Sequence, residues 1–198
     1  MKMQFQTGDD FIAFKDELRD RLKKREIRKI DISGHKPSAV KMIIMNRDNS
    51  PHVLLTKRST KVATHKGQIS FPGGVFDTED IDIKNTAYRE TFEEVGIPPD
   101  RIEYIGRFDD YISIFGHHVT CFIGAIEYPF EYNFNRDEID DYVEAPLSIF
   151  ANEEYDKVLP YTYEGKTRNV YYYYFRGYEI WGLTARILTD FGRLILKD

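Results

Sequence analysis

The residues best placed to do chemistry are three glutamates near the middle of the chain, Glu90, Glu93 and Glu94. At roughly 100° of rotation per residue, a helix would hold their side chains within an arc of about 100°. Carboxylates crowded in this way repel one another, which costs stability unless a cation neutralises them. Their hard oxygen atoms are ligands that Mg2+ and Mn2+ prefer. The spacing therefore predicts a helix whose acidic face binds a divalent metal ion.

The opposite face of this helix is predicted to pack on a sheet, because its residues are mostly apolar. They are Ala87, Tyr88, Thr91, Phe92 and Val95, centred roughly 140° from the acids. Arg89 can neutralise only part of the acidic cluster. We expect it to pair with Glu93, one helical turn further on, or with Glu94, and so to orient a metal ligand.

The composition is that of one globular domain with extensions. The chain has 198 residues, of which 41% are hydrophobic and 15% aromatic, and this is enough for one sizeable core. A net charge of -5 argues against a sequence-independent nucleic-acid binder. No stretch approaches the roughly 18 apolar residues of a membrane span. Cys121 is the only cysteine, which fits a reducing compartment, so a soluble cytoplasmic protein is expected.

The N-terminal segment reads as an amphipathic helix that packs against the rest of the chain. Residues 9–26 place four apolar side chains at intervals of three and four among charged ones, namely Phe11, Phe14, Leu18 and Leu22. A linker is predicted at 29–37, where Gly34 and Pro37 interrupt the pattern. We therefore divide the chain into an N-terminal helix and linker at 1–36 and a main domain at 37–198.

The main domain alternates between strand and helix patterns. Strands are predicted at 39–45, 52–58, 68–71, 102–108, 119–126 and 169–175, and the first two form a hairpin. Helices are predicted around the glutamates, at 146–150 and from residue 182 onwards. Pro72-Gly73-Gly74 is predicted to be a sharp turn. The fold class is thus α/β, with a mixed β-sheet sandwiched between helices.

The acidic segment resembles the signature of the Nudix family. That signature is a Gly, five residues, a Glu, seven residues and then Arg-Glu-U-x-Glu-Glu-x-Gly-U, where U is apolar. Here the second half reads RETFEEVGI at residues 89–97, with Thr91 at an apolar position. Counted from Gly74, the first acid is Asp80 in place of Glu, and Arg89 comes one residue late. These departures put the largely structural role of that first acid in doubt for Asp80.

The flanking sequence resembles the coenzyme A pyrophosphatase branch of the same family. The resembling blocks are LLTKRS at 54–59, HKGQISFPGG at 65–74, GHHVT at 116–120 and IWGLTARIL at 180–188. This branch also tolerates the inserted residue and the Asp. The resemblance implies a Nudix fold and hydrolysis of the diphosphate of coenzyme A, or a derivative, to 4'-phosphopantetheine (or its acyl form) and adenosine 3',5'-bisphosphate.

The resemblance also implies which residues form the site. Glu90, Glu93 and Glu94 match the metal-binding and catalytic glutamates, with Arg89 among the catalytic residues and Mg2+ or Mn2+ as the cofactor. The carbonyl of Gly74 can complete the coordination shell, and Gly73 and Gly74 belong to the substrate-binding turn.

Arg58 and Lys66 are candidate phosphate contacts, although either can equally be an exposed cation. Glu138 is a candidate base or extra ligand, against the simpler interpretation of a solvated turn at 137–141. His65, His117 and His118 are read as ordinary hydrogen-bonding residues rather than metal ligands.

Other functions remain open at this level. We expect a small nucleotide substrate, and the first alternative to coenzyme A is another nucleoside diphosphate derivative, such as ADP-ribose or a dinucleoside polyphosphate. A domain that binds a nucleotide as a sensor without hydrolysing it is a further alternative, but such domains usually lose glutamates that this chain keeps. A homodimer formed through the N-terminal helix or the aromatic strands, including the tyrosines at 171–174, is also an open expectation.

Overall fold

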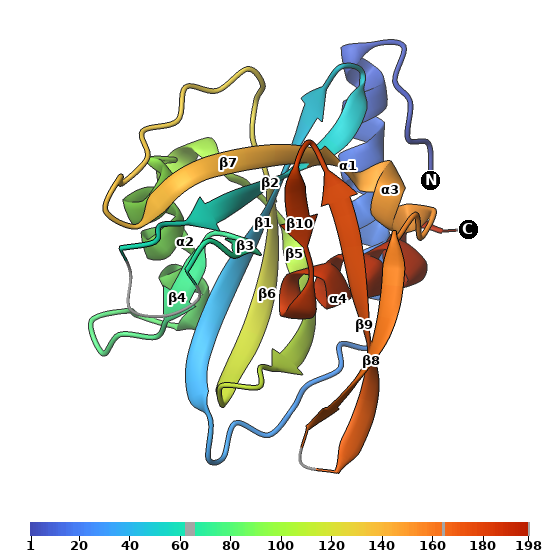
Figure 1. The fold of residues 1–198 in the computed structure, drawn as a ribbon. Helices are drawn as coiled ribbons and strands as arrows, with labels where there is room; N and C mark the ends of the chain where they lie inside the picture. Colours follow the sequence, from blue (N-terminus) through green and yellow to red (C-terminus); the bar gives the residue numbers. More distant parts are fainter. Residues whose placement is uncertain (62–65, 164, 198) are drawn as a thin grey trace.

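A mixed sheet of seven strands forms the centre of the molecule in the computed structural model, which describes residues 1–61, 66–163 and 165–197 (Figure 1). Its main path runs in the order β3-β2-β1-β6-β5, while β4 pairs with β1 and β7 pairs with β2. The strands are β1 (Lys36–Arg47), β2 (Ser50–Arg58), β3 (Ile69–Ser70), β4 (Gly73–Val75), β5 (Glu103–Ile112), β6 (His117–Ala125) and β7 (Ile139–Pro146). The β1–β6 pair is parallel and the others are antiparallel.

Helices flank this sheet, as the sequence predicted. They are α1 (Gly8–Lys24), α2 (Ile83–Val95), α3 (Leu147–Ala151) and α4 (Gly182–Phe191), together with a 3-10 turn η1 (Pro99–Arg101) and a π-helical turn η2 (Gly192–Leu196) that continues α4. Helix α2 packs against β1 and β4, whereas α1 packs against β5. The predicted α/β fold class is therefore confirmed, and none of the helices in the described ranges is long and apolar enough to span a membrane.

The two faces of the sheet are buried in different hydrophobic clusters because alternate residues of a strand point to opposite sides. In β1, Met42 and Ile44 join the larger cluster, which includes Phe14 and Leu18 of α1. Ile43 and Met45 belong to the smaller cluster, which includes Val95 at the end of α2. The helix that carries the glutamates is thus fixed to one face of the central strand.

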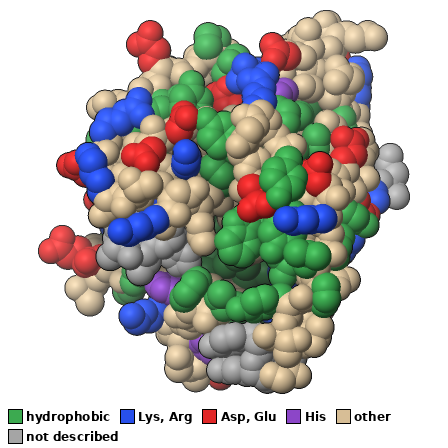
Figure 2. All heavy atoms as spheres, viewed as in Figure 1, with side chains coloured by type: hydrophobic (Ala, Val, Ile, Leu, Met, Phe, Trp, Pro, Cys, Tyr) green, Lys and Arg blue, Asp and Glu red, His purple; other side chains and the backbone are tan. Residues whose placement is uncertain are grey.

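A second, smaller sheet has the order β10-β9-β8, formed by β8 (Lys157–Tyr163), β9 (Lys166–Phe175) and β10 (Tyr178–Ile180). Tyr173 points into the core and shares a hydrogen bond of 2.8 Å with Thr189. Tyr172 points the other way and stacks on Trp181, with ring centroids 5.9 Å apart and an interplanar angle of 4°. Hydrophobic side chains gather on the surface over β9, β10 and α4 (Figure 2), and Tyr174 is among the exposed ones.

The sequence pattern did not predict strands β8 and β10, and three further features of the fold differ from the sequence-based expectation. Gly73 and Gly74 belong to strand β4 rather than to a turn, because β1 supplies the pairing partner. Phe92 is 51% exposed, although the helical pattern placed it on the packed face. The acidic stretch 137–141 is only partly a turn, since β7 begins at Ile139 and pairs with β2.

Candidate functional site

Helix α2 has a defined start and end. The Asp82 side chain accepts a hydrogen bond from the backbone N–H of Asn85 at 2.8 Å, which caps the N-terminus. Gly96 ends the helix in the left-handed conformation, with φ of 73°, and its N–H donates to the Phe92 carbonyl at 2.9 Å. The segment after β6 completes the end, because the N–H groups of Asn133 and Asn135 donate to carbonyls of the last turn at 3.1 Å each.

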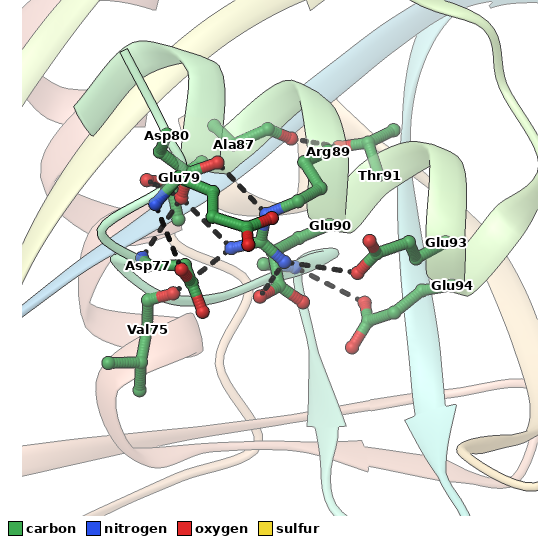
Figure 3. A network of polar contacts seen from close by, with 12 residues as sticks. Val75, Asp77, Glu79, Asp80, Ala87, Arg89, Glu90, Thr91, Glu93 and Glu94 are labelled. Atoms are coloured by element: carbon green, nitrogen blue, oxygen red, sulfur yellow. Dashed lines mark hydrogen bonds and ion pairs between the residues drawn. The ribbon is translucent and has the colours of Figure 1, made fainter. Parts of the chain in front are cut away.

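The three glutamates share one side of α2 but differ in exposure (Figure 3). The side chain of Glu94 is 2% exposed, that of Glu90 is 16% exposed and that of Glu93 is 49% exposed. Glu90 and Glu94 face the strand formed by Gly73 and Gly74. Glu93 therefore forms the outer edge of the acidic face, and the other two acids form its inner part.

Arg89 joins four groups of this site through its guanidinium (Figure 3). It holds Asp80 with two hydrogen bonds, Nε to Oδ1 at 2.9 Å and Nη2 to Oδ2 at 3.0 Å. Its Nη1 donates to Glu90 at 2.9 Å and to Glu93 at 3.0 Å, and Nη2 donates to the Val75 carbonyl at 3.2 Å. The hydrogen bond from Arg89 is the main reason that the pKa of Asp80 falls to about 2. Asp80 thus ties the loop before α2 to the acidic face.

Glu94 is the most buried acid of the site. Arg58 Nη1 lies 3.4 Å from its Oε1, and the Gly73 N–H donates to its Oε2 at 3.2 Å. The pKa of Glu94 is raised to about 8, mainly by burial and to a smaller extent by the charges of Glu90 and Glu138, against the opposing effects of Arg58 and the Gly73 N–H. Burial also raises the pKa of Glu90. Burial therefore disfavours the ionised form of both inner acids, in spite of the arginines beside them.

The backbone at position 74 lies so close to the Glu90 carboxylate that only glycine fits there without a shift. A Cβ atom added to Gly74 would lie 2.3 Å from Glu90 Oε1. At Gly73, where φ is 155°, an added Cβ would lie 2.3 Å from the Ala39 carbonyl oxygen of β1. The two glycines therefore allow strand β4 to pass directly beneath the carboxylates of α2.

The donor set suits a divalent cation. As the side chains stand, no three carboxylate, imidazole or thiol groups within the described residues gather closely enough to hold an ion. Arg89 and Arg58 lie against the acids instead. The acids are nevertheless hard oxygen donors beside a glycine strand, and burial disfavours the ionised form of Glu90 and Glu94. A divalent ion bound by these carboxylates would favour their ionised form, so the residues fit a divalent cation.

The remaining predicted residues lie in different surroundings. Lys66 is exposed on the segment between β2 and β3, and His65 lies outside the described residues. His117 contacts the Ser38 hydroxyl at 2.8 Å, and His118 Nε2 lies 3.1 Å from the Ile30 carbonyl oxygen. Both histidines therefore make ordinary polar contacts on β6, as the sequence suggested.

Glu138 lies close enough to the inner acids for its charge to raise the pKa of both Glu90 and Glu94. Its Oε1 accepts a hydrogen bond from Asn135 Nδ2 at 3.1 Å, while its carbonyl accepts one from the Ser59 N–H at 2.7 Å. The start of β7 is thus connected both to the segment that caps α2 and to the end of β2. This arrangement brings Glu138 to the acidic face, which its position in the sequence does not reveal.

A buried charge behind α2 was not singled out from the sequence. Lys41 is 0% exposed, and its Nζ lies 3.3 Å from the centroid of the Tyr88 ring, without a hydrogen-bond partner among the described residues. The pKa of Lys41 is lowered to about 7, mainly by burial and to a smaller extent by the nearby charge of Lys84. The sequence does indicate this buried charge, because Lys41 interrupts the apolar run of residues that forms β1.

The comparisons with known proteins agree with this geometry. The NUDIX domain model matches residues 35–172. The chain is 32% identical over 184 residues to the uncharacterized Nudix hydrolase NudL of Enterobacter sp. (strain 638), covering 93% of this chain and 92% of that one. It is also 32% identical over 190 residues to NudL of Escherichia coli O7:K1, covering 96% and 95% of the two chains. The chain belongs to the Nudix family, as a hydrolase that acts on phosphoanhydride bonds.

A solved structure shows the same fold. The crystal structure of a MutT/nudix family protein from Enterococcus faecalis aligns with a TM-score of 0.50 and 13% sequence identity, covering 98% of this chain and 76% of that one. The Nudix fold expected from the sequence is therefore confirmed.

Proposed function

We propose that this Nudix pyrophosphohydrolase cleaves coenzyme A or one of its derivatives. Its products would be 4'-phosphopantetheine, or the acyl form, and adenosine 3',5'-bisphosphate. The observation that carries the proposal is the position of the two sequence blocks that resemble the coenzyme A pyrophosphatase branch. Arg58 lies in the block at 54–59 and Gly73 lies in the block at 65–74, and both contact Glu94 of α2. The blocks that carry the resemblance thus line the acidic face.

In this proposal Glu90, Glu93 and Glu94 hold Mg2+ or Mn2+, with the Gly74 carbonyl as a further ligand. The bound ion would neutralise the diphosphate and lower the pKa of a water molecule. Arg89 positions Glu90 and Glu93 through the hydrogen bonds described above. Its own orientation is fixed from the other side by Asp80.

Arg58 and Lys66 are the proposed phosphate contacts. The buried Nε of Arg58 has no hydrogen-bond partner among the described residues, so this guanidinium has unused donor capacity beside the acids. Lys66 is exposed and can approach a phosphate as a point charge. A phosphate oxygen that accepts hydrogen bonds from Arg58 would also draw the guanidinium away from Glu94, and this would free the carboxylate for its role in the reaction.

A carboxylate must take the proton of the attacking water. The water oxygen forms a bond to phosphorus, the bridging bond between the two phosphates breaks, and the departing phosphate leaves with the electrons of that bond. Glu94 is one candidate base, because its carboxylate lies in the inner part of the acidic face, beside Gly73. Glu138 is the other candidate, because its charge reaches the inner acids. Comparison of the Glu138→Gln and Glu94→Gln rates would assign the role.

The test is a product assay. We expect incubation with coenzyme A and Mg2+ to release adenosine 3',5'-bisphosphate and 4'-phosphopantetheine, resolved by chromatography. ADP-ribose and a dinucleoside polyphosphate serve as parallel substrates. Turnover of either one without turnover of coenzyme A would assign the enzyme to another nucleotide, and binding without any hydrolysis would indicate a sensor.

Three further expectations accompany the proposal. The cytoplasm is the proposed compartment, because the chain has a single cysteine, Cys121, which is buried and cannot form a disulfide within the chain. A homodimer remains a prediction, as does the division of the chain at residue 36. Gel filtration with light scattering would determine the oligomeric state.

A further inference from the structure

We propose that a hollow beside Phe92 binds the nucleobase of the diphosphate substrate. The hollow has a volume of about 300 Å3 and lies at the C-terminal end of α2. It is lined by Phe92, Glu93, Gly96, Asn133, Phe134 and Asn135. This inference rests on the proposed function, since it concerns one half of a nucleoside diphosphate, but it holds equally for coenzyme A and for ADP-ribose.

The hollow has a wall that is built independently of any ligand. The N–H groups of Asn133 and Asn135 donate to the carbonyls of Val95 and Glu94, which fixes the segment after β6 over the end of α2. The Phe134 ring stacks on Tyr142 of β7, with ring centroids 4.8 Å apart and an interplanar angle of 24°. The positions of both the backbone and the aromatic ring of this wall are therefore determined by the fold.

Gly96 makes the close contact between the helix end and this wall. A Cβ added at this position would lie 2.7 Å from Asn133 Cβ and 2.8 Å from the Asn133 carbonyl oxygen. The helix end and the wall are thus in direct contact at the base of the hollow.

The exposed Phe92 is unusual for its position. It is 51% exposed, while Thr91 and Val95 of the same helix are buried. An aromatic ring held on a helix beside a second ring offers apolar surface of the kind on which a planar heterocycle stacks. The side-chain amide of Asn133 makes no hydrogen bond with any described residue, and it can supply both a donor and an acceptor to the polar edge of a base.

The hollow adjoins the acidic face, and this indicates which part of the substrate binds in it. Glu93 lines the hollow and is also the outermost of the three acids, bonded to Arg89. A substrate whose diphosphate lies on the acidic face can therefore extend past Glu93 into the hollow. The planar and polar-edged end of a nucleotide matches two aromatic rings and an amide, whereas a flexible pantetheine arm has no ring to stack. The nucleobase is thus the end that the chemistry of the hollow favours.

The experiment compares two ligands that differ only by the base. AMP and ribose 5-phosphate carry the same phosphate, and AMP is common to coenzyme A and ADP-ribose. Their affinities for the full-length protein are measured by isothermal titration calorimetry with Mg2+ present. We expect the wild type to bind AMP more tightly than ribose 5-phosphate. Phe92→Ala should weaken the affinity for AMP about tenfold and leave the affinity for ribose 5-phosphate unchanged.

Three variants provide the controls. Phe115→Ala removes a phenylalanine of similar exposure, 59%, from the turn before β6, at the opposite end of that strand, and should alter neither affinity. Phe92→Leu keeps apolar volume without a ring and should resemble Phe92→Ala, while Phe92→Tyr should retain AMP affinity. Thermal melting of each variant checks that it is folded.

Equal affinity of the wild type for both ligands would overturn the inference. An equal loss of affinity for AMP and for ribose 5-phosphate in Phe92→Ala would also overturn it. A loss confined to 4'-phosphopantetheine, measured in the same way, would assign the hollow to the other half of the substrate. The proposed function fails separately, by absence of coenzyme A hydrolysis in the wild type, whatever the affinity for AMP.

Discussion

Arg89 and Asp80 face each other through two parallel hydrogen bonds of 2.9 and 3.0 Å, across the loop that precedes α2. Asp has one methylene fewer than the Glu of the family signature, and one extra residue separates it from the arginine. The structure shows that the pair forms despite both departures. Because the same guanidinium bonds to Glu90 and Glu93, the position of the loop and the position of two acids depend on one another.

Asp80→Asn tests this dependence. The pKa of Asp80 is about 2 in the folded protein and 3.8 ordinarily. The ionised group therefore adds stability above about pH 4, and this contribution is lost as the pH falls towards 2. We expect the variant to lose about 1–3 kcal/mol of unfolding free energy at pH 7, and the difference from wild type to shrink below pH 4.

Urea unfolding at pH 7, 5 and 3 measures the effect of Asp80→Asn. Asp137→Asn, whose parent side chain is 90% exposed, should change stability little at any of these values. A difference between Asp80→Asn and wild type that stays constant down to pH 3 would contradict the ion pair.

Glu94→Gln separates chemistry from folding. The folded protein keeps the Glu94 proton up to about pH 8, while the ordinary pKa is 4.5. Folding therefore binds a proton in this window, and the metal-free wild type should lose stability as the pH rises through it, by at most about 1.4 kcal/mol per pH unit. The variant should lack this slope, while its Mg2+-dependent turnover should fall by about 100-fold or more.

The measurements are melting curves from pH 5 to 8.5, with and without Mg2+, beside initial rates. Mg2+ should raise the melting temperature of wild type more than that of Glu94→Gln. Glu131→Gln, on the exposed segment after β6, is the matched control and should follow wild type throughout. Full activity of Glu94→Gln would remove this residue from the site.

Lys41→Met should stabilise the protein. The Lys41 pKa is about 7 in the folded protein and 10.5 ordinarily, so folding releases a proton between these values and wild-type stability rises with pH across that window. Methionine avoids the cost of burying the ammonium group. We therefore expect its advantage to be largest at pH 6 to 7, about 1–3 kcal/mol, and to diminish towards pH 10.

Urea unfolding at pH 6.5 and 9.5 tests the Lys41 prediction. Lys61→Met replaces a lysine whose side chain is 67% exposed, and it should show neither the gain nor the pH dependence. If Lys41→Met were equally stabilising at both pH values, the buried charge would not be the cause.

The neighbouring glycines should respond differently to alanine. At Gly74 the added Cβ meets the end of the Glu90 side chain, which can move aside, whereas at Gly73 it meets the backbone of β1 at an unfavourable positive φ. Gly74→Ala should therefore keep most of its stability and lose activity, while Gly73→Ala should lose about 2 kcal/mol or more of stability. Rates and melting temperatures measured on the same preparations distinguish the two outcomes, and equal melting temperatures would contradict this assignment of strain.

The spacing of apolar residues predicted the helices and strands whose buried face can be recognised from their own sequence. The helix at α1 was expected at 9–26 and is found at Gly8–Lys24, and the hairpin of β1 and β2 was placed within a few residues. The strands β7, β8 and β10 were missed. Residues 139–146 hold few consecutive apolar side chains, and their strand conformation comes from pairing with β2, far away in sequence.

The candidate site likewise has a part that the local sequence pattern predicts and a part that it does not. The three acids and Arg89 share one helix, so their proximity follows from spacing alone. Arg58 reaches Glu94 from the end of β2, and Glu138 approaches from the start of β7. Those relationships depend on the order of the strands, which the local pattern does not encode. The exposure of Phe92 has the same origin, because the helix period does not reveal how much of the helix surface the rest of the fold covers.

The stacking of Trp181 on Tyr172 gives the molecule a built-in optical probe. Trp181 is the only tryptophan, and it lies between the small sheet and the start of α4. Its intrinsic fluorescence therefore reports on the surroundings of that sheet and of the start of α4. Opening of this sheet ahead of the main one during denaturation would appear as a fluorescence transition that precedes the loss of circular dichroism.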